Sequence, residues 1–319
     1  MRFLVAALVL GSSLAHAQDY PNKPIRMLVP FAPGGAVDTT ARVLAQAMQQ
    51  RLKDWQFVIE NRPGGNGFIA TTAVAKAAPD GYTLLMAHTG EFAVNPALFP
   101  DVPYELERDF VAITMVSDAP MLYLATAKAP FNTFQELVAQ AKAKPGSITY
   151  GSAGNGSINH LAGEWLAQAA GIQLLHVPYK GGAPAAAAVA AGDVHFGVMA
   201  APGAIPHIKS GRGKVIGITT AKKSPLDPSW ATPRDAGIPD LDASIWVGLF
   251  APKGTPQAVV DRLNREVRET LKVPDVQKRF IESAGGEAIG MTQAEFLARI
   301  KADAERYKRV VQKAGVKPG

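Results

Sequence analysis

The stretch PIRMLVPFAPGGAVDTTARVLAQAM, residues 24–48, contains the pattern that decides the fold. Residues 25–30 form a short apolar run, which is typical of a buried strand. From residue 37 to residue 52, apolar side chains recur with the period of a helix. A glycine-containing loop at residues 30–38 joins the two. We therefore predict a strand–loop–helix unit of the kind that builds α/β folds.

The switch from a short apolar run to a helical period recurs through the chain. Further strands are predicted at residues 56–60, 82–87, 121–126, 148–151, 174–177, 194–198, 215–219 and 245–250, and helices at residues 68–77, 134–143, 158–170 and 184–191. After residue 250 only helical patterns remain, one of them opened by a capping box of Thr292 and Glu295. Repeated strand–helix units imply parallel or mixed sheets covered by helices.

Composition excludes several classes of protein. The chain has 319 residues, enough for two domains or one large α/β domain. Hydrophobic residues at 47% and charged residues at 19% exclude wholesale disorder. The absence of cysteine excludes disulfides, thiolate metal sites and cysteine nucleophiles. The net charge of +6 comes from scattered Lys and Arg, so we predict no nucleic-acid interface.

The first 17 residues have the pattern of a secretory signal peptide. Arg2 precedes an apolar run at residues 3–10, and Ala15-His16-Ala17 fits a cleavage site. The alternative is a buried N-terminal helix. No later apolar run approaches the ~18 residues of a membrane span. We therefore expect residues 1–17 to be removed and the mature protein to be soluble and exported.

Two glycine-rich loops are candidate anion sites. They lie at residues 30–38 and 150–157, each between a predicted strand and a predicted helix. Backbone N–H groups of such a turn and of the following helix N-terminus point into the loop mouth, where they can bind an anion. Neither loop contains Lys or Arg, so backbone amides and hydroxyl groups would hold the anion. The alternative is a pair of tight turns that need glycine for their backbone conformation.

Other motifs indicate a dinucleotide, metal or hydrolase site only weakly. Residues 64–70 contain G-x-G-x-x-A, but Asp80 lies in a turn, which disfavours dinucleotide binding. His160 and Glu164 are four residues apart on a helix, so they form either part of a metal site or a helix-surface pair. A hydrolase site could be drawn from Ser152, Ser157 and His160, yet no spacing selects it. We predict no catalytic residue, no metal and no cofactor.

Several segments together resemble one family. They are YPNKPIRMLVPFAPGGAVD at 20–38, VIENRPGGNG at 58–67, PDGYTLL at 79–85, NPALF at 95–99, YGSAGNGS at 150–157, HLAGE at 160–164, HVPYKGGAPA at 176–185, PHIKSG at 206–211 and GLFAPKGTP at 248–256. In this order they resemble the tripartite tricarboxylate transporter solute receptors of bacteria, also called Bug receptors. The resemblance extends over nearly the whole mature chain, from residue 20 to about residue 315.

The resemblance implies a two-lobed periplasmic binding protein of the type II fold. Each lobe would be a mixed sheet flanked by helices, and two crossover strands would join the lobes. Lobe 1 would comprise residues 20–117 and 245–319, and lobe 2 residues 118–244. Trp246, on the returning crossover strand, is expected either near the hinge or simply in the core.

The resemblance also implies a function without chemistry. Family members bind a small organic carboxylate in the cleft, without a cofactor, and deliver it to the membrane permease subunits of a tripartite tricarboxylate transporter. We therefore expect a periplasmic, monomeric receptor that is not an enzyme. Two alternatives stay open: a ligand-sensing receptor for a signalling partner, and a periplasmic hydrolase that acts on a carboxylate substrate.

The family places the ligand carboxylate between the two glycine-rich loops. Residues that follow the strand at 82–87, together with Tyr179 and Met199, would shape the rest of the cleft. The expected ligand-binding residues are Phe31, Ala32, Pro33, Gly34, Gly35, Asp38, His88, Thr89, Glu91, Phe92, Ser152, Ala153, Gly154, Asn155, Gly156, Ser157, Tyr179 and Met199. Many relatives have Asp where this chain has His195, so the ligand cannot be copied from a relative.

Glu91 is the candidate for setting specificity. It follows a predicted strand closely, at the end where α/β sheets bind ligands. A carboxylate there would accept a hydrogen bond from the ligand and repel a second ligand carboxylate, so plain dicarboxylates would bind poorly. The alternative is that Glu91 caps a helical turn at the surface.

Overall fold

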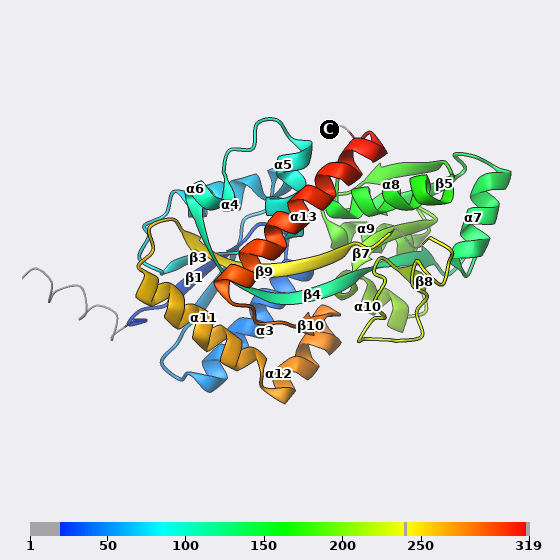
Figure 1. The fold of residues 1–319 in the computed structure, drawn as a ribbon. Coiled ribbons are helices and arrows are strands. Elements are labelled where there is room, and N and C mark those ends of the chain that lie inside the picture. Colours follow the sequence, from blue (N-terminus) through cyan, green and yellow to red (C-terminus); the bar gives the residue numbers. More distant parts are fainter. Residues whose placement is uncertain (1–19, 239–240, 317–319) are drawn as a thin grey trace, which may run out of the picture.

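The computed structural model describes residues 20–238 and 241–316, so the predicted signal peptide lies outside the described residues. The strands are β1 (Ile25–Val29), β2 (Phe57–Asn61), β3 (Thr83–His88), β4 (Phe110–Thr126), β5 (Ile148–Ser152), β6 (Leu174–Pro178), β7 (Phe196–Ala200), β8 (Gly213–Ile218), β9 (Ser244–Pro252) and β10 (Glu287–Ala288). The chain folds into two lobes that lie side by side, with β4 and β9 running between them (Figure 1).

Helices of the first lobe are α3 (Ala36–Arg51), α4 (Phe68–Ala75), α5 (Asn95–Leu98), α6 (Leu106–Asp109), α11 (Gln257–Leu271) and α12 (Pro274–Arg279), with short turns η1 (Gly65–Gly67), η2 (Gly90–Val94) and η3 (Phe280–Ala284). The second lobe contains α7 (Phe134–Ala143), α8 (Ile158–Ala170), α9 (Gly182–Ala191) and α10 (Ala201–Lys209). A long C-terminal helix, α13 (Gln293–Ala314), completes the chain. Among the described residues, no helix is both long enough and apolar enough to cross a membrane.

Most predicted elements are confirmed within one or two residues. The helix predicted at 158–170 and the helix at 134–143 have the predicted bounds. The capping box of Thr292 and Glu295 is also present and opens α13. The strand predicted at 121–126 is only the last part of β4, which begins at Phe110. Two register irregularities against β9 and a proline at position 120 break the alternating pattern that would have revealed this half of the strand.

The two lobes share β4. In the first lobe the strand order is β2-β1-β3-β9-β4, with β1 parallel to β2 and β3, and with β9 antiparallel to β3 and β4. In the second lobe β4 pairs antiparallel with β7 and β8, while β5 is parallel to β6 and β7. The change of partners falls between Pro120 and Met121. Both sheets are therefore mixed, as predicted.

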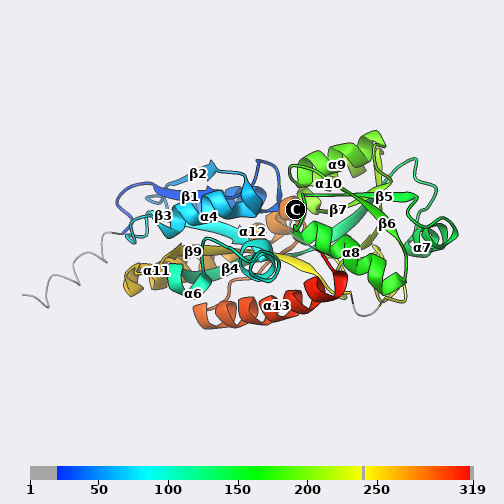
Figure 2. The ribbon, with the colours of Figure 1, turned by 90° about the horizontal axis from the view of Figure 1, so that it is seen from above.

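Helices cover both faces of each sheet, so each lobe has its own core. On the first lobe, α3 and α11 pack on one face, while α4 and the start of α13 pack on the other. On the second lobe, α7 and α8 cover one face and α9 and α10 the other. This layered arrangement presents the loops after the strands toward the other lobe (Figure 2).

The C-terminal helix contacts both lobes. Phe296 packs in the core of the first lobe, whereas Tyr307 and Val311 pack in the core of the second. The side-chain amide of Gln168 on α8 also donates to the carbonyl of Lys313, at 2.9 Å. Because α13 spans both lobes, as Figures 1 and 2 show, the lobe boundaries drawn from the sequence stay a prediction.

Polar side chains tie α13 to the crossover strands. Trp246 on β9 is fully buried, and its indole Nε1–H donates to Oδ2 of Asp303 at 2.9 Å. Arg299 donates to the same Asp303 oxygen at 2.8 Å and reaches Oδ2 of Asp118 on β4 at 3.3 Å. Trp246 thus packs in the core, as one of the two expectations has it, and a position near the hinge stays a prediction.

Trp246→Phe should destabilise the protein. The change removes the indole donor and leaves the buried Asp303 carboxylate with one partner fewer, which costs about 1–3 kcal/mol. Urea denaturation measures the free energy of unfolding. The matched control is Trp230→Phe, because Trp230 is only partly buried. Equal destabilisation by the two variants would contradict a structural role for the Trp246–Asp303 bond.

Candidate ligand-binding site

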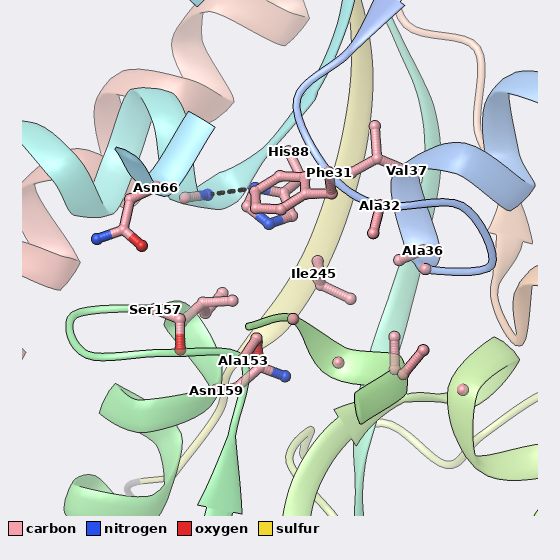
Figure 3. Close-up of a pocket in the computed structure, with 18 of the residues that line it drawn as sticks. Phe31, Ala32, Ala36, Val37, Asn66, His88, Ala153, Ser157, Asn159 and Ile245 are labelled. Atoms are coloured by element: carbon pink, nitrogen blue, oxygen red, sulfur yellow. Dashed lines mark hydrogen bonds between the residues drawn. The ribbon is translucent and has the colours of Figure 1, made fainter. Parts of the chain in front are cut away.

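A cavity of about 80 Å³ lies between the two lobes (Figure 3). One water takes roughly 10–15 Å³ by this measure, so the cavity can hold a small molecule. Its described lining consists of Phe31, Ala32, Pro33, Gly35, Ala36, Val37, Asn66, His88, Gly90, Asn95, Ala153, Gly156, Ser157, Ile158, Asn159, Gly181, Gly182, Ala183, Pro184, Ala200, Gly203 and Ile245. Asn66 and His88 come from the first lobe and face Ser157 and Asn159 of the second, with Ile245 on β9 between them.

Of the described helices longer than eight residues, four begin at this cavity. The N-terminal residues of α3, α8, α9 and α10 all contribute to the lining. The N-caps of α3 and α9 are Gly35 and Gly181, which provide no side-chain cap. The first N–H groups of a helix have no partner within the helix, and the helix dipole makes this end positive. The cavity therefore presents backbone donors and positive potential, although no Lys or Arg appears in its described lining.

Asp38 shapes the first glycine-rich loop from behind. Its carboxylate accepts from the backbone N–H of Gly34 and from the side-chain amide of Asn61, both at 2.9 Å. Arg42 donates to it at 3.0 Å. Burial alone would raise the pKa of Asp38, but the hydrogen bonds from Arg42, Gly34 and Asn61 outweigh burial and lower the pKa. Asp38 is almost fully buried and does not line the cavity, so it holds the loop in place.

The second glycine-rich loop is held by Ser157 and His160. The Ser157 hydroxyl donates to the Gly154 carbonyl at 2.7 Å and accepts from the His160 N–H, which caps α8. Nδ1 of His160 accepts from the backbone N–H of Gly156 at 3.1 Å. The ring of His160 stacks on that of His176, with centroids 3.8 Å apart. Two imidazoles therefore support the loop from below.

Both rings are neutral in the neutral pH range. Burial and the neighbouring His176 lower the pKa of His160 to about 4, and burial lowers the pKa of His176 to about 4. A neutral ring can keep an unprotonated Nδ1, which the bond from Gly156 requires. The hydrogen-bonding pattern of the loop and the lowered pKa of His160 thus agree.

Ser152 and His176 are close together but are not placed to act on a molecule in the cavity. Oγ of Ser152 lies 2.6 Å from Nε2 of His176, but Ser152 is fully buried and outside the cavity lining. Nε2 of His160 lies 3.8 Å from Oε1 of Glu164, and this oxygen accepts from the Tyr150 hydroxyl. Within residues 20–238 and 241–316, no group of three or more His, Asp or Glu residues could hold a metal ion.

Eight of the predicted ligand-binding residues line the cavity: Phe31, Ala32, Pro33, Gly35, His88, Ala153, Gly156 and Ser157. Ten others lie outside the lining: Gly34, Asp38, Thr89, Glu91, Phe92, Ser152, Gly154, Asn155, Tyr179 and Met199. Phe92 packs in a core of the first lobe, and Met199 packs in a core of the second lobe. For the eight lining residues, contact with a ligand stays a prediction.

Glu91 differs from both expectations. Its side chain is fully buried, so it is neither at the surface nor in the cavity lining. Oε2 accepts from the backbone N–H of His88 at 2.8 Å. The carboxylate fits against Gly67, where a Cβ atom would lie 2.4 Å from Oε1. Because Gly67, 24 residues earlier in the chain, has no side chain, the Glu91 carboxylate can turn inward. The position of Glu91 in the sequence did not reveal this.

Sequence reasoning also missed part of the lining. The start of α9 at residues 181–184 carries the same glycine-before-helix pattern as the two glycine-rich loops, so this pattern could have identified it. Asn66, Asn95 and Asn159 carry no such signal, because they meet only in the folded chain. Asn66 also joins the lobes, since its amide donates to the Asn155 carbonyl at 3.1 Å.

Comparisons with family models and with solved structures place the chain in the same family. The family model described as "Tripartite tricarboxylate transporter family receptor" matches residues 40–316. The periplasmic binding protein BugD is 35% identical, with a TM-score of 0.85, over 93% of this chain and 99% of that chain. A protein from R. palustris solved with adipate is 30% identical, with a TM-score of 0.90, over 94% of this chain and 100% of its own.

MatC from Rhodopseudomonas palustris, solved with bound malate, is a third similar structure. It is 30% identical, with a TM-score of 0.83, over 92% of this chain and 100% of that chain. These structures confirm the predicted two-lobed binding-protein fold.

Stability should fall in acid because His160 and His176 are held neutral. Both have a lower pKa in the folded protein, about 4, than the ordinary value of 6.5. The unfolded chain therefore binds more protons, and the free energy of unfolding decreases as pH drops from about 6.5 to about 4. Urea denaturation at several pH values measures this slope.

His160→Asn is the matched variant for the pH experiment. Its amide oxygen can still accept from the Gly156 N–H, but the residue no longer titrates. Carboxylates also titrate in this pH range and contribute to both slopes. The informative quantity is therefore the difference between the wild type and His160→Asn in the slope of the free energy of unfolding against pH. We expect a shallower slope in the variant, and an identical slope would contradict the account of this pair.

Proposed function

Since this chain belongs to the tripartite tricarboxylate transporter receptor family, we propose that it captures a small carboxylate between its two lobes. The observation that carries the proposal is the meeting of four helix N-termini at one cavity. Of these, α3 belongs to the first lobe, and α8, α9 and α10 belong to the second. An anion at this point would pair with donors from both lobes, so its binding would favour the closed arrangement of the lobes.

One carboxylate is the anchor of the proposed ligand. Each hydrogen bond from an N–H to a carboxylate contributes about 1.5–3 kcal/mol. Two or three such bonds, with burial of the ligand body against Val37 and Ile245, are compatible with micromolar affinity, or about −8 kcal/mol. Much tighter binding would slow the release of the ligand, which a delivery receptor requires. The structures of relatives with adipate and malate support carboxylates as the ligand class.

The partner and the location follow from the family. We propose that the protein acts in the periplasm, delivers its ligand to the permease subunits of a tripartite tricarboxylate transporter, and changes no bond in the ligand. Residues 1–17 would be a cleavable signal peptide, and the mature receptor would be a monomer. Residues 20–117 with 245–319, and residues 118–244, would be the two moving units, bending at β4 and at the entry to β9.

Ala36→Pro should weaken carboxylate binding while leaving the fold intact. Ala36 is the first residue of α3 and lines the cavity. Proline is tolerated at this position but has no N–H group. Gly35 is already extended, with φ −82° and ψ 177°, as the residue before proline must be. Loss of one amide donor should raise the Kd for a carboxylate by about 10-fold or more, as measured by calorimetry.

Ala36→Ser is the matched control, because it keeps the backbone N–H and adds only a small polar group. Its Kd should stay near that of the wild type. The probes are succinate and adipate, with thermal unfolding as a check on folding. Unchanged affinity in Ala36→Pro, with the fold intact, would contradict anchoring of the carboxylate at the start of α3.

A further inference from the structure

His88 is held rigidly at the end of β3, facing the cavity. It lines the cavity but is only 9% exposed. One face of its ring lies against the ring of Phe31, with centroids 4.6 Å apart and planes at 39°. The two rings lie beside each other at the cavity wall (Figure 3). A side chain fixed in this way presents one defined edge to any bound molecule.

The Nδ1 edge of the ring is occupied by the protein. The backbone N–H of Gly90 donates to Nδ1 at 2.9 Å. Oε2 of Glu91 lies 2.8 Å from the same nitrogen and also accepts from the backbone N–H of His88. Glu91 is fully buried, so its carboxyl group acts on the ring and not on the cavity.

These contacts assign the proton on the other nitrogen. A neutral ring that accepts from Gly90 at Nδ1 carries its hydrogen on Nε2. A neutral ring with its hydrogen on Nδ1 would instead donate to Oε2 of Glu91 and leave Nε2 as an acceptor, but it would lose the bond from Gly90. The backbone N–H of Gly90 points at Nδ1, so this contact favours the hydrogen on Nε2, where it is a donor. An additional hydrogen between Nδ1 and Oε2 of Glu91 would leave Nε2–H unchanged. Within the described part of the chain Nε2 has no hydrogen-bond partner, so the donor is available to a ligand.

Two glycines make room for the pair. A Cβ atom at Gly90 would lie 2.4 Å from Cε1 of His88. A Cβ atom at Gly67 would lie 2.4 Å from Oε1 of Glu91, and Gly67 has a φ of +91° that other residues rarely adopt. The backbone therefore accommodates this one placement of both side chains. The neighbouring lining residue Asn95 already donates from its amide nitrogen to Asn66 and Tyr104.

We propose that His88 is a specificity-determining residue that donates Nε2–H to a second acceptor oxygen on the ligand. The favoured class is a carboxylate that bears a hydroxyl, a keto oxygen or a second carboxylate. Glu91 is a positioning residue that acts through the ring. This differs from the sequence-based expectation that Glu91 would repel a second carboxylate. The inference rests on the proposed function, in which helix N-termini hold the first carboxylate.

The test compares two acid pairs that differ only by a second carboxylate: butanoate with succinate, and hexanoate with adipate. Calorimetry on the wild type should show that the diacid of at least one pair binds about 10- to 150-fold tighter. His88→Asn keeps an acceptor near Nδ1 but has no group at Nε2, so the preference should shrink to about 2-fold or less. His88→Gln places an amide donor near Nε2 and should keep most of the preference.

Glu91→Gln tests the positioning role. The diacid-to-monoacid ratio of affinities should fall, while the affinity for the monoacid stays near that of the wild type. A purely structural role would weaken both acids together. Thermal unfolding of each variant reports whether it is folded.

The outcomes separate the two proposals. If the wild type binds both acids of each pair equally, or if His88→Asn keeps the full preference, the role of His88 is wrong and the receptor function stands. If the wild type binds none of the four acids, the proposed function is contradicted and the role of His88 with it.

Discussion

Unpaired N–H groups at helix N-termini are the constraint on which the rest of the structure depends. Four helices begin at one cavity, and the N-caps of two of them are glycines that cannot cap with a side chain. Such donors must be satisfied by water or by a ligand. A carboxylate satisfies several of them together and also matches the positive ends of the helix dipoles. Selectivity for an anion therefore needs no lysine or arginine in the cavity.

The topology explains why the site depends on two lobes. Because β4 changes sheets at Pro120 and Met121, the helices that follow β1 and β5 belong to different units yet begin at the same cavity. The C-terminal helix α13 adds a third connection beside the crossover strands. Its Arg299 and Asp303 contact Asp118 on β4 and Trp246 on β9, so polar contacts tie α13 to both crossover strands.

The sequence predicts local features well and long-range placement poorly. The strand-to-helix switch at residues 24–48 gave β1 and α3, and glycine-rich loops at both lobes reach the cavity through Gly35 and Gly156. The first part of β4 was missed because its register irregularities against β9 and Pro120 break the alternating pattern of a strand. The inward turn of Glu91 depends on the space beside Gly67, which no local pattern reports.

A crystal structure of the receptor with a bound dicarboxylate such as adipate tests the central claim most directly. We predict one carboxylate within about 3 Å of backbone N–H groups from both lobes, among them that of Ala36 and one at the start of α8 or α9. A carboxylate paired instead with a lysine or arginine side chain, or bound by one lobe alone, would contradict it.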